Sequence, residues 1–122
     1  MLCRGVRGAT LVTNNTKESI LAASRELLQK IVDTNGIDTD MISCAIFTTT
    51  SDLNASFPAA AARQMGWNNV PLLDAREIEV PDSLKMCLRI LILFNTDKKP
   101  SDIKHVYLKG TESLRSAPPP IM

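Results

Sequence analysis

Hydrophobic residues recur at helical spacing between Thr16 and Val32, which is the clearest pattern in the chain. The recurring positions are Ile20, Leu21, Leu27, Leu28, Ile31 and Val32. Spacings of three and four residues place such side chains on one face of a helix. Asn15 or Thr16 can cap its start, and Gly36 can end it in a left-handed conformation. The pattern therefore predicts one long amphipathic helix.

Other stretches are extended in character, because they are rich in β-branched residues or alternate between apolar and polar positions. They cover residues 3–13, 42–50, 70–73, 77–80, 86–95 and 103–108, with a turn between 73 and 77. The segment 86–95 is the most apolar, so we expect a central strand covered on both faces. Pro58 suits the first turn of a short helix that runs to Met65 and stops at Gly66.

Strands and helices interleave along the chain, but the helices are too few for a doubly wound sheet. The predicted fold class is α+β, with one β-sheet, one long amphipathic helix on a face, and short helices. Residues 1–115 are expected to form a single domain, and the Pro-rich residues 116–122 a flexible tail. A single long helix leaves much of the other sheet face uncovered, so this architecture favours an oligomer.

Composition narrows the classes of partner. The chain has 122 residues, of which 44% are hydrophobic and 22% charged, as is ordinary for one globular domain. Its formal net charge of +1 provides no global field, so we expect neither a nucleic acid nor a membrane partner. The apolar run at 90–94 is too short to span a membrane, and the N-terminus lacks the apolar stretch of a signal peptide. A cytoplasmic protein is expected.

Catalytic signatures of covalent and metal chemistry are missing from the sequence. Cys3, Cys44 and Cys87 are widely spaced and, with the single histidine His105, form no zinc pattern. There is no GxSxG elbow, no Walker loop and no GxGxxG motif. We therefore expect no metal and no cofactor, and we interpret the cysteines as buried, inert thiols.

The candidate chemistry lies in arginines placed within apolar strands. Arg89 lies in the most apolar strand, where an unpaired cation is costly, so it must face a carboxylate, a cleft or a ligand. Arg7 raises the same question, Tyr107 supplies a hydroxyl, and Glu77 is a natural counter-charge. A purely structural Arg89–Glu77 ion pair is an equally good interpretation of these residue types.

For three further residues, the residue type alone gives weaker support for a role in the site. Arg63 and Arg115 are better interpreted as solvated charges, and Phe57 before Pro58 as a plain hydrophobic staple. A site that combines several arginines with one glutamate and one tyrosine would nonetheless suit a small polyanion.

Six segments together point to one family. They are RGVRGAT (4–10), DLNASFPA (52–59) followed by Arg63, VPL (70–72), CLR (87–89), NTD (95–97) and HVYL (105–108). In their order and spacing, apart from a one-residue shortening near Gly66 and Trp67, they resemble the small chorismate mutases first known from Bacillus. The resemblance runs from about Arg4 to Arg115.

This resemblance implies a homotrimer of mixed β-sheets carrying helices, with active sites at the subunit interfaces and chorismate as the substrate. It implies conversion of chorismate to prephenate by a [3,3] rearrangement in the shikimate pathway to phenylalanine and tyrosine. By position, Arg7, Arg89 and Tyr107 match residues that hold the enolpyruvyl side and the ether oxygen, and Glu77 matches the residue that takes the ring hydroxyl. The residues matched to the pocket walls, some of them from the neighbouring chain, are Phe57, Arg63, Leu114 and Arg115.

Two departures from the family pattern affect these expectations. Ala60 stands where family members often have a lysine, so one peripheral cation is missing. Asp74 stands where some relatives have a cysteine. Asp74 can replace that cysteine if the position acts mainly through its backbone N–H. If the Asp74 side chain is instead turned toward Glu77, the pKa of one of the two carboxyls is raised.

Two other functions remain open at this point. One is a non-catalytic trimeric module that binds a small carboxylate ligand, against which the intact set of Arg7, Glu77, Arg89 and Tyr107 argues. The other is a trimeric deaminase acting on imines, which no motif supports. The set of residues favours an isomerase, because the rearrangement requires neither a nucleophile nor a proton transfer.

Overall fold

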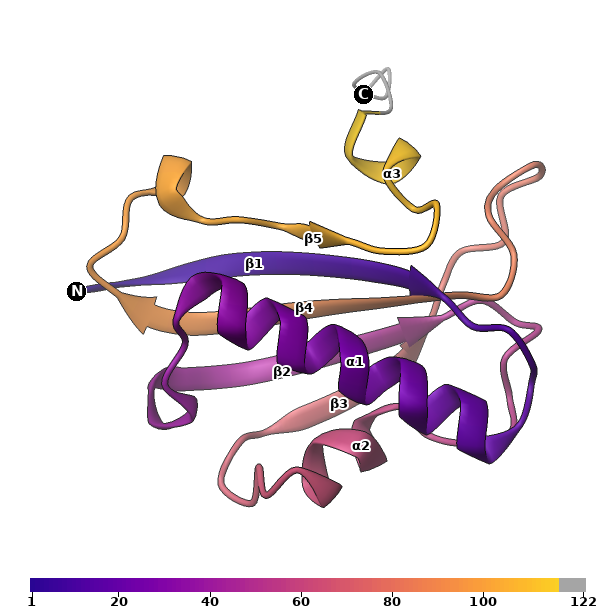
Figure 1. Ribbon diagram of the computed structural model, residues 1–122, viewed down its shortest axis with the longest axis horizontal. Coiled ribbons are helices and arrows are strands. Elements are labelled where there is room, and N and C mark those ends of the chain that lie inside the picture. The colour runs from indigo at the N-terminus through magenta and orange to yellow at the C-terminus, as the bar shows by residue number, and fades with distance from the viewer. Residues whose placement is uncertain (117–122) are drawn as a thin grey trace.

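The computed structural model describes residues 1–116, with side chains described through Leu114, and it shows an α+β fold (Figure 1). The strands are β1 (Leu2–Leu11), β2 (Ile42–Thr49), β3 (Leu72–Arg76), β4 (Cys87–Thr96) and β5 (Val106–Tyr107). They form one sheet in the order β3-β2-β4-β1-β5. The pairs β1–β5 and β2–β3 are parallel, whereas β1 and β2 are antiparallel to β4. The sheet is therefore mixed, and the predicted fold class is confirmed.

Helix α1 (Lys17–Asn35) begins at one of the two predicted caps, because the Thr16 hydroxyl accepts a hydrogen bond from the Ser19 N–H at 3.1 Å. It ends at Gly36, whose φ of 59° is left-handed. The helix runs three residues beyond the predicted apolar pattern. The reason is Asn35, which is buried and bonds to the Ile31 carbonyl and to both backbone groups of Lys104. Polar atoms that are satisfied in this way can be buried at a helix end.

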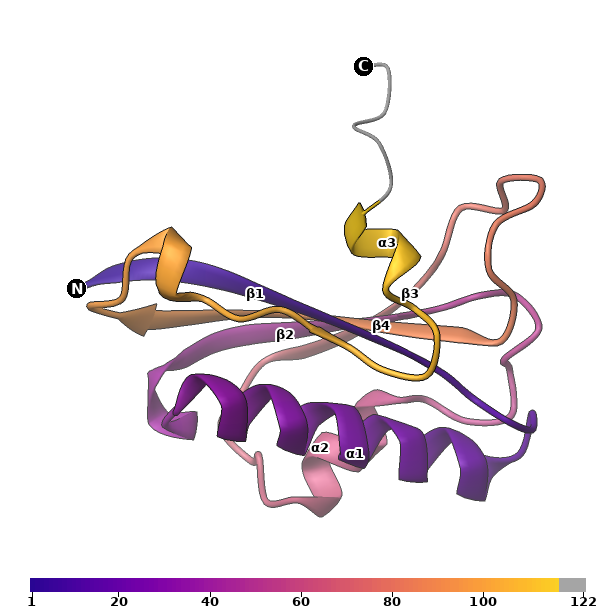
Figure 2. The same cartoon turned by 45° about the horizontal axis from the view of Figure 1, so that its top comes forward.

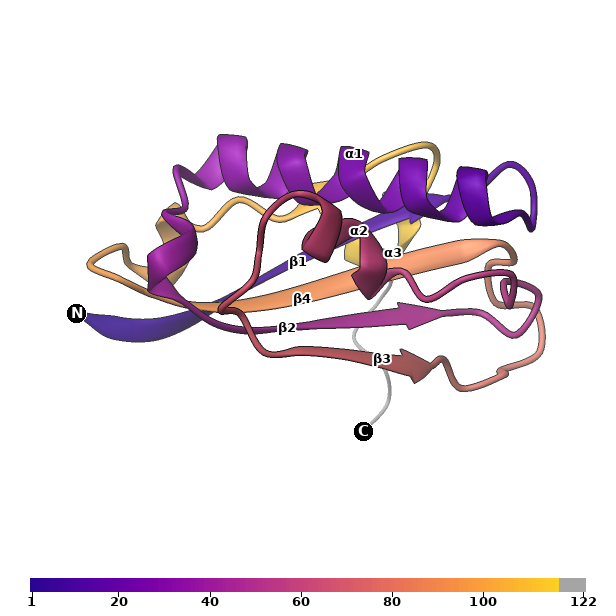
Figure 3. The same ribbon diagram turned by 90° about the horizontal axis from the view of Figure 1, so that it is seen from below.

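Helix α1 and the short helix α2 (Ala59–Gln64) cover the same face of the sheet (Figures 1 and 3). On β4 the alternate residues Leu88, Ile90, Ile92 and Phe94 are at most 2% exposed and face these helices. The expectation of a central strand is confirmed, and within one chain the helices cover one of its two faces, as expected for an architecture with a single long helix. Arg89 and its alternate neighbours lie on the opposite face, which α1 and α2 do not cover.

Figure 2 shows that the third helix, α3 (Ser113–Ser116), and the loop at 77–86 rise from this second face. We call it the open face of the sheet. Apart from Ser116, the last residue of α3, the predicted tail at 116–122 lies outside the described residues. The open face, flanked by α3 and the loop, is where the sheet can present side chains to a ligand or to another subunit.

Two extended segments differ from their predictions. The residues expected to form a turn, 74–76, belong to β3, and the expected strand at 77–80 does not form. Asp74 and Arg76 are unusual in strands, but their side chains bond to Ala59 and to the 49–53 segment, which fixes β3 at the sheet edge. The expected strand at 103–108 narrows to β5, because Ile103 ends a 3₁₀ turn at Pro100–Asp102.

Gly8 on β1 allows α1 to approach the sheet closely. A Cβ at this position would lie 2.6 Å from Ile31 Cδ1 and 3.0 Å from Leu27 Cδ1, whereas one at Gly5 would meet Leu93 Cδ2 at an ordinary 3.4 Å. We expect Gly8→Ala to lower the free energy of unfolding by about 1–3 kcal/mol through overpacking. Gly5→Ala is the matched control and should change it by less than about 0.5 kcal/mol. Urea unfolding followed by circular dichroism makes the comparison, and equal midpoints would contradict the packing argument.

Candidate functional site

A cavity of about 260 Å³ opens on the uncovered face of the sheet. It is lined by Arg7, Gly8, Ile46, Thr48, Glu77, Arg89, Ile90, Leu91, Tyr107 and Leu114. Five sequence-predicted site residues, Arg7, Glu77, Arg89, Tyr107 and Leu114, are thus brought together in one chain. They come from four separate segments and from α3, so no short motif could have shown their proximity.

Strand register explains why these side chains meet. Thr48 of β2 and Ala9 of β1 are both paired with Arg89 of β4, and Tyr107 of β5 is paired with Ala9. Paired residues point to the same face, so these four form one row across the open face. Three of them, Thr48, Arg89 and Tyr107, line the cavity, whereas Ala9 is fully buried between its neighbours.

A second row lies beside the first and completes the cavity floor. Leu91 of β4 is paired with both Ile46 of β2 and Arg7 of β1. The first row is mainly polar and the second mainly apolar, with Arg7 at its end. The cavity therefore combines cationic groups with an apolar surface, an arrangement that suits a small organic anion.

Arg89 and Glu77 form a two-pronged ion pair within the cavity. Arg89 Nε donates to Glu77 Oε2 at 2.6 Å, and Arg89 Nη2 donates to Glu77 Oε1 at 2.5 Å. The Thr48 hydroxyl donates to the same Oε2 atom. The Glu77 side chain is only 15% exposed, whereas that of Arg89 is 47% exposed. The ion pair expected from residue types is therefore present, and it lies at the cavity wall rather than in a sealed core.

The charge states of this pair follow from its contacts. The Arg89 hydrogen bonds hold the pKa of Glu77 below its ordinary value, against the opposing effect of burial, and Thr48 adds to the lowering. The same bonds to Glu77 raise the pKa of Arg89. Burial raises the pKa of the neighbouring Cys87 thiol to about 11, so Cys87 stays protonated near neutral pH. The cavity thus holds a carboxylate and a guanidinium side by side.

The lowered pKa of Glu77 predicts a dependence of stability on pH. A carboxyl whose pKa is lower in the folded state stabilises the fold above its unfolded pKa of about 4.3, and the effect is lost as the pH falls through the folded value. We expect the free energy of unfolding of the wild type to exceed that of Glu77→Gln by about 1 kcal/mol or less at pH 7, since the ion pair is partly solvated. That advantage should shrink as the pH is lowered to about 3.

Urea unfolding at both pH values measures this difference. Glu26→Gln is the control, because the Glu26–Lys109 pair is 3.5 Å apart and about half exposed. If the difference in free energy of unfolding between the wild type and Glu77→Gln grew as the pH fell, it would contradict the lowered pKa assigned to Glu77.

Arg7 is held in place through its backbone. Its N–H donates to His105 Nδ1 at 3.0 Å, which ties β1 to the segment that leads into β5. His105 is half-buried, and its ring accepts this backbone hydrogen bond. This bond fixes the start of the second row and leaves the Arg7 guanidinium exposed at the cavity.

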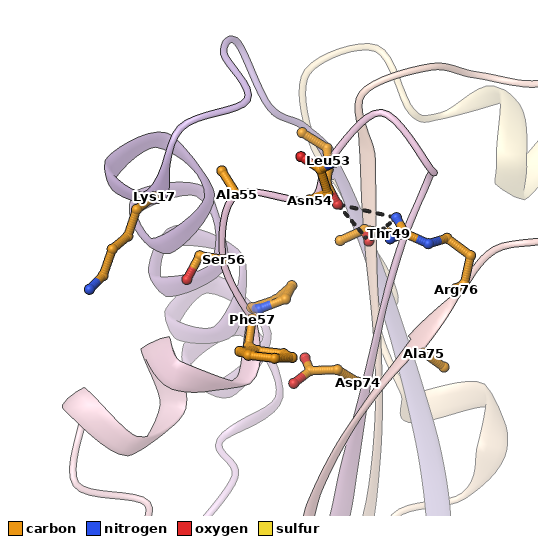
Figure 4. Close-up of a pocket in the computed structure, with 11 residues that line it drawn as sticks. Lys17, Thr49, Leu53, Asn54, Ala55, Ser56, Phe57, Asp74, Ala75 and Arg76 are labelled. Carbon is orange, nitrogen blue, oxygen red and sulfur yellow. Dashed lines mark hydrogen bonds between the residues drawn. The ribbon is translucent and has the colours of Figure 1, made fainter.

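Phe57 and Asp74 lie at a different cavity, on the helix-bearing side of edge strand β3 (Figure 4). This cavity has a volume of about 470 Å³, and Arg76 closes one side of it by donating to Thr49 Oγ1 and to the carbonyls of Thr50 and Leu53. Phe57 is 71% exposed. The chain therefore presents two candidate surfaces that do not meet within one protomer.

Asp74 points away from Glu77. It is paired with the buried Phe47, so its side chain faces the helices, and its Oδ1 accepts a hydrogen bond from the Ala59 N–H at 3.0 Å. Of the two orientations that the sequence left open for Asp74, a side chain turned toward Glu77 is therefore not the one found within the chain. Burial raises the pKa of Asp74, whereas the Ala59 bond and the charge of Arg63 oppose that rise. Asp74 holds the start of α2 against the edge strand.

Among the described residues, the predicted wall residue Arg63 does not line the Arg89 cavity of its own chain. Arg63 is an exposed residue of α2, close enough to Asp74 to affect its pKa. Ala60 is half-buried on the same helix. Arg115 belongs to α3, but its side chain lies outside the described part of the structure.

Sequence reasoning missed Thr48, Ile46, Leu91 and Gly8 as cavity residues. The usable signal was alternation in residues 42–50, which places Ile46 and Thr48 on one face. That signal alone could not reveal which face carries Arg89, because register between strands is set by pairing. Across residues 1–116, no group of three or more His, Cys, Asp or Glu side chains is placed to hold a metal ion. In the same range, no helix is both long and apolar enough to cross a membrane.

The fold and cavity define an α+β domain with paired arginine and carboxylate groups on an open sheet face. A family model described as chorismate mutase type I matches residues 3–117 of this chain. The chain therefore belongs to the chorismate mutase type I family.

Individual relatives agree with this assignment. The chain is 48% identical over 115 residues to chorismate mutase AroH of Thermus thermophilus, and the aligned region covers 93% of this chain and 94% of that protein. It is 39% identical over 116 residues to chorismate mutase AroH of Bacillus subtilis strain 168, covering 94% and 91%. A solved chorismate mutase from Clostridium thermocellum superposes with a TM-score of 0.87 at 48% identity, covering 89% of this chain and 97% of that one.

Proposed function

We propose that this protein is an isomerase that converts chorismate to prephenate, with the cavity on the open face as its active site. The observation that carries the proposal is the Arg89–Glu77 pair in a cavity shared with Arg7 and Tyr107, in a chain that matches the family over nearly its whole length. The reaction is a unimolecular [3,3] rearrangement in which the ether C–O bond breaks while a new C–C bond forms. It supplies prephenate for the synthesis of phenylalanine and tyrosine.

Substrate binding is proposed to use the cationic groups of the cavity. Arg7 and Tyr107 hold the enolpyruvyl side of chorismate, and Glu77 accepts a hydrogen bond from the ring hydroxyl. Each carboxylate oxygen can accept more than one hydrogen bond, so the bonds from Arg89 and Thr48 leave acceptor capacity on Glu77. Holding both ends of the substrate favours the compact conformer from which the rearrangement proceeds.

Transition-state stabilisation is proposed to come from Arg89. Negative charge grows on the ether oxygen as its bond to carbon lengthens, and a preorganised guanidinium favours that charge more than the neutral ground state. A guanidinium has five N–H donors, of which the Glu77 bonds use two. The Glu77 pair therefore orients Arg89 while leaving donors for the ligand. An acceleration of about a million-fold requires roughly 8 kcal/mol from orientation and electrostatics together.

The active form is proposed to be a homotrimer with its sites at the subunit interfaces. Helices α1 and α2 cover the other face of the sheet, and the open face carries exposed apolar side chains, among them Leu73 at 60% and Ile78 at 84% exposure. Phe57 and Arg63 lie on a separate surface, near the sheet edge. In a ring of three chains, that surface of one protomer supplies the outer wall of its neighbour's Arg89 cavity.

The first experiment is to mix the purified protein with chorismate and to follow the loss of its ultraviolet absorbance while identifying the product. Rapid loss that yields prephenate, and that Arg89→Ala abolishes, supports the proposal. No turnover by folded protein would favour the non-catalytic binding of a small carboxylate, which the family match otherwise disfavours. Deamination of imines has no supporting observation in the cavity.

A mixing experiment tests the shared site. We expect Arg89→Ala and Arg63→Ala each to disable every site of a trimer made of that variant alone. If the two residues of one site come from neighbouring chains, a mixed trimer can contain intact sites. Refolding the two variants together regenerates intact sites wherever wild-type Arg89 meets wild-type Arg63, which is roughly one site in four for random mixing. Recovery of activity on mixing, with a trimeric mass by sedimentation, is the expected result. Absence of recovery, with mixed trimers present, would rule out this division of the site.

A further inference from the structure

We propose that Thr48 is a positioning residue that fixes the orientation of the Glu77 carboxylate. The inference rests on the function proposed above and adds to it a group whose role is exerted through Glu77. Thr48 Oγ1 donates to Glu77 Oε2, the atom that also receives Arg89 Nε. The same oxygen is thus held from two strands, because Thr48 is on β2 and Arg89 is its partner on β4.

The need for such a restraint follows from the position of Glu77. Glu77 lies just beyond the end of β3, where its N–H donates to the Thr49 carbonyl at 3.0 Å. Its side chain has three rotatable bonds, and Arg89 is itself long and half exposed. Thr48 is short and β-branched, so its χ1 torsion is stiff and its hydroxyl position is set by the strand. It therefore fixes the position of Oε2 from β2, while Arg89 holds both carboxylate oxygens from β4.

The neighbouring threonines do not share this role. The Thr49 hydroxyl is directed to the Leu53 carbonyl at 3.3 Å, and the Thr50 hydroxyl donates to Asp52 at 2.5 Å. Alternation along β2 turns Thr48 to the open face and its successor to the helix side. Within the run of three threonines, Thr48 is the residue that lines the Arg89 cavity.

The charged and titratable groups around Glu77 set the expected response to pH. Arg89 and Cys87 come from β4, and Arg7 and Tyr107 line the same cavity from β1 and β5. Because the pKa values of Cys87 and Arg89 are both raised, Cys87 stays protonated and Arg89 stays charged through the range in which Glu77 titrates. Loss of the Thr48 donor therefore removes one favourable contact of the Glu77 anion while leaving its charged neighbours unchanged.

The test compares Thr48→Val, which keeps the side-chain shape but removes the hydroxyl, with Thr48→Ser, which keeps the hydroxyl. Thr34→Val, on an exposed position of α1, is the matched control. We expect Thr48→Val to lower kcat/KM for chorismate by about tenfold. The acid limb of its pH profile should move upward by about half a pH unit, because Glu77 loses a donor to its anion. Thr48→Ser should restore both quantities.

A second readout does not depend on turnover. In the unliganded protein, NMR titration of the Glu77 carboxyl carbon should give a higher apparent pKa in Thr48→Val than in the wild type and in Thr48→Ser. An active wild type whose kinetics, pH profile and Glu77 titration are unchanged in Thr48→Val overturns the inference alone. A wild type that does not turn over chorismate overturns the proposed function instead, and with it the catalytic purpose of this contact.

Discussion

Arg89→Lys is expected to keep its fold and to lose about a thousand-fold or more in kcat. Lysine preserves the positive charge but offers a point-like ammonium in place of a planar fork. It cannot hold both oxygens of Glu77 and simultaneously direct donors to an ether oxygen. Removing a single preorganised donor to a developing oxyanion costs about 10²–10³ in rate, and this variant also loses the orientation of its partner. The rate of chorismate loss at saturating substrate measures the effect.

Arg25→Lys is the matched control for this substitution. Arg25 is an exposed residue of α1 whose Nη1 donates to Gln64 at 3.0 Å, on the opposite side of the sheet from the cavity. Its variant should turn over chorismate at the wild-type rate. Near-normal turnover by folded Arg89→Lys would exclude the role assigned to Arg89, because charge alone would then suffice.

Glu77→Ala is expected to lower kcat/KM by at least about a hundredfold while the protein remains folded. The substitution removes the acceptor proposed for the substrate hydroxyl and releases the guanidinium of Arg89 from its fixed orientation. The effect on stability should be small, about 1 kcal/mol, because Arg89 is half exposed and can be hydrated when its partner is lost. Parallel measurements of turnover and of urea unfolding separate the two effects.

The result distinguishes a functional from a purely structural ion pair. If Glu77→Ala unfolds the protein or dissociates the proposed trimer, the pair serves chiefly to hold the structure together. Glu26→Ala is the control, since it removes the carboxylate of another ion pair, with Lys109, that lies outside the cavity. That variant should retain both activity and stability.

Local features of this chain could be predicted well from sequence. Thr16 and Gly36 bound helix α1 because a side-chain cap and a left-handed glycine act within a few residues of their own positions. The strand β3 was misjudged because its polar residues are satisfied by distant partners. Asp74 bonds to Ala59, and Arg76 reaches the carbonyls of Thr50 and Leu53. The strand propensity of a residue does not depend on hydrogen-bond partners that are distant in the sequence, so it could not predict this strand.

The candidate site could likewise be predicted only in part. A cation inside an apolar strand required a partner or a cleft, and this reasoning identified both Arg89 and Glu77. It could not identify Thr48, because the pairing of β2 with β4 decides that Thr48 stands beside Arg89. Nor could it separate the surface that carries Phe57 and Asp74 from the Arg89 cavity. That separation depends on the pairing of Asp74 with the buried Phe47, which turns Asp74 toward the helices and away from the Arg89 cavity.

The position of β1 has a consequence for how the protein is made. Its ten residues are synthesised before both of its neighbours in the sheet, β4 and β5, since Leu2 pairs with Thr96 and Gly8 with Val106. Synthesis proceeds at about 5–20 residues per second, so the N-terminal segment waits several seconds for its partners. During this interval α1 can form and β2 can be extended, but the two rows of the cavity floor have no shared surface. The two rows can share a surface only once β4 is present, because β4 lies between β1 and β2 in the sheet.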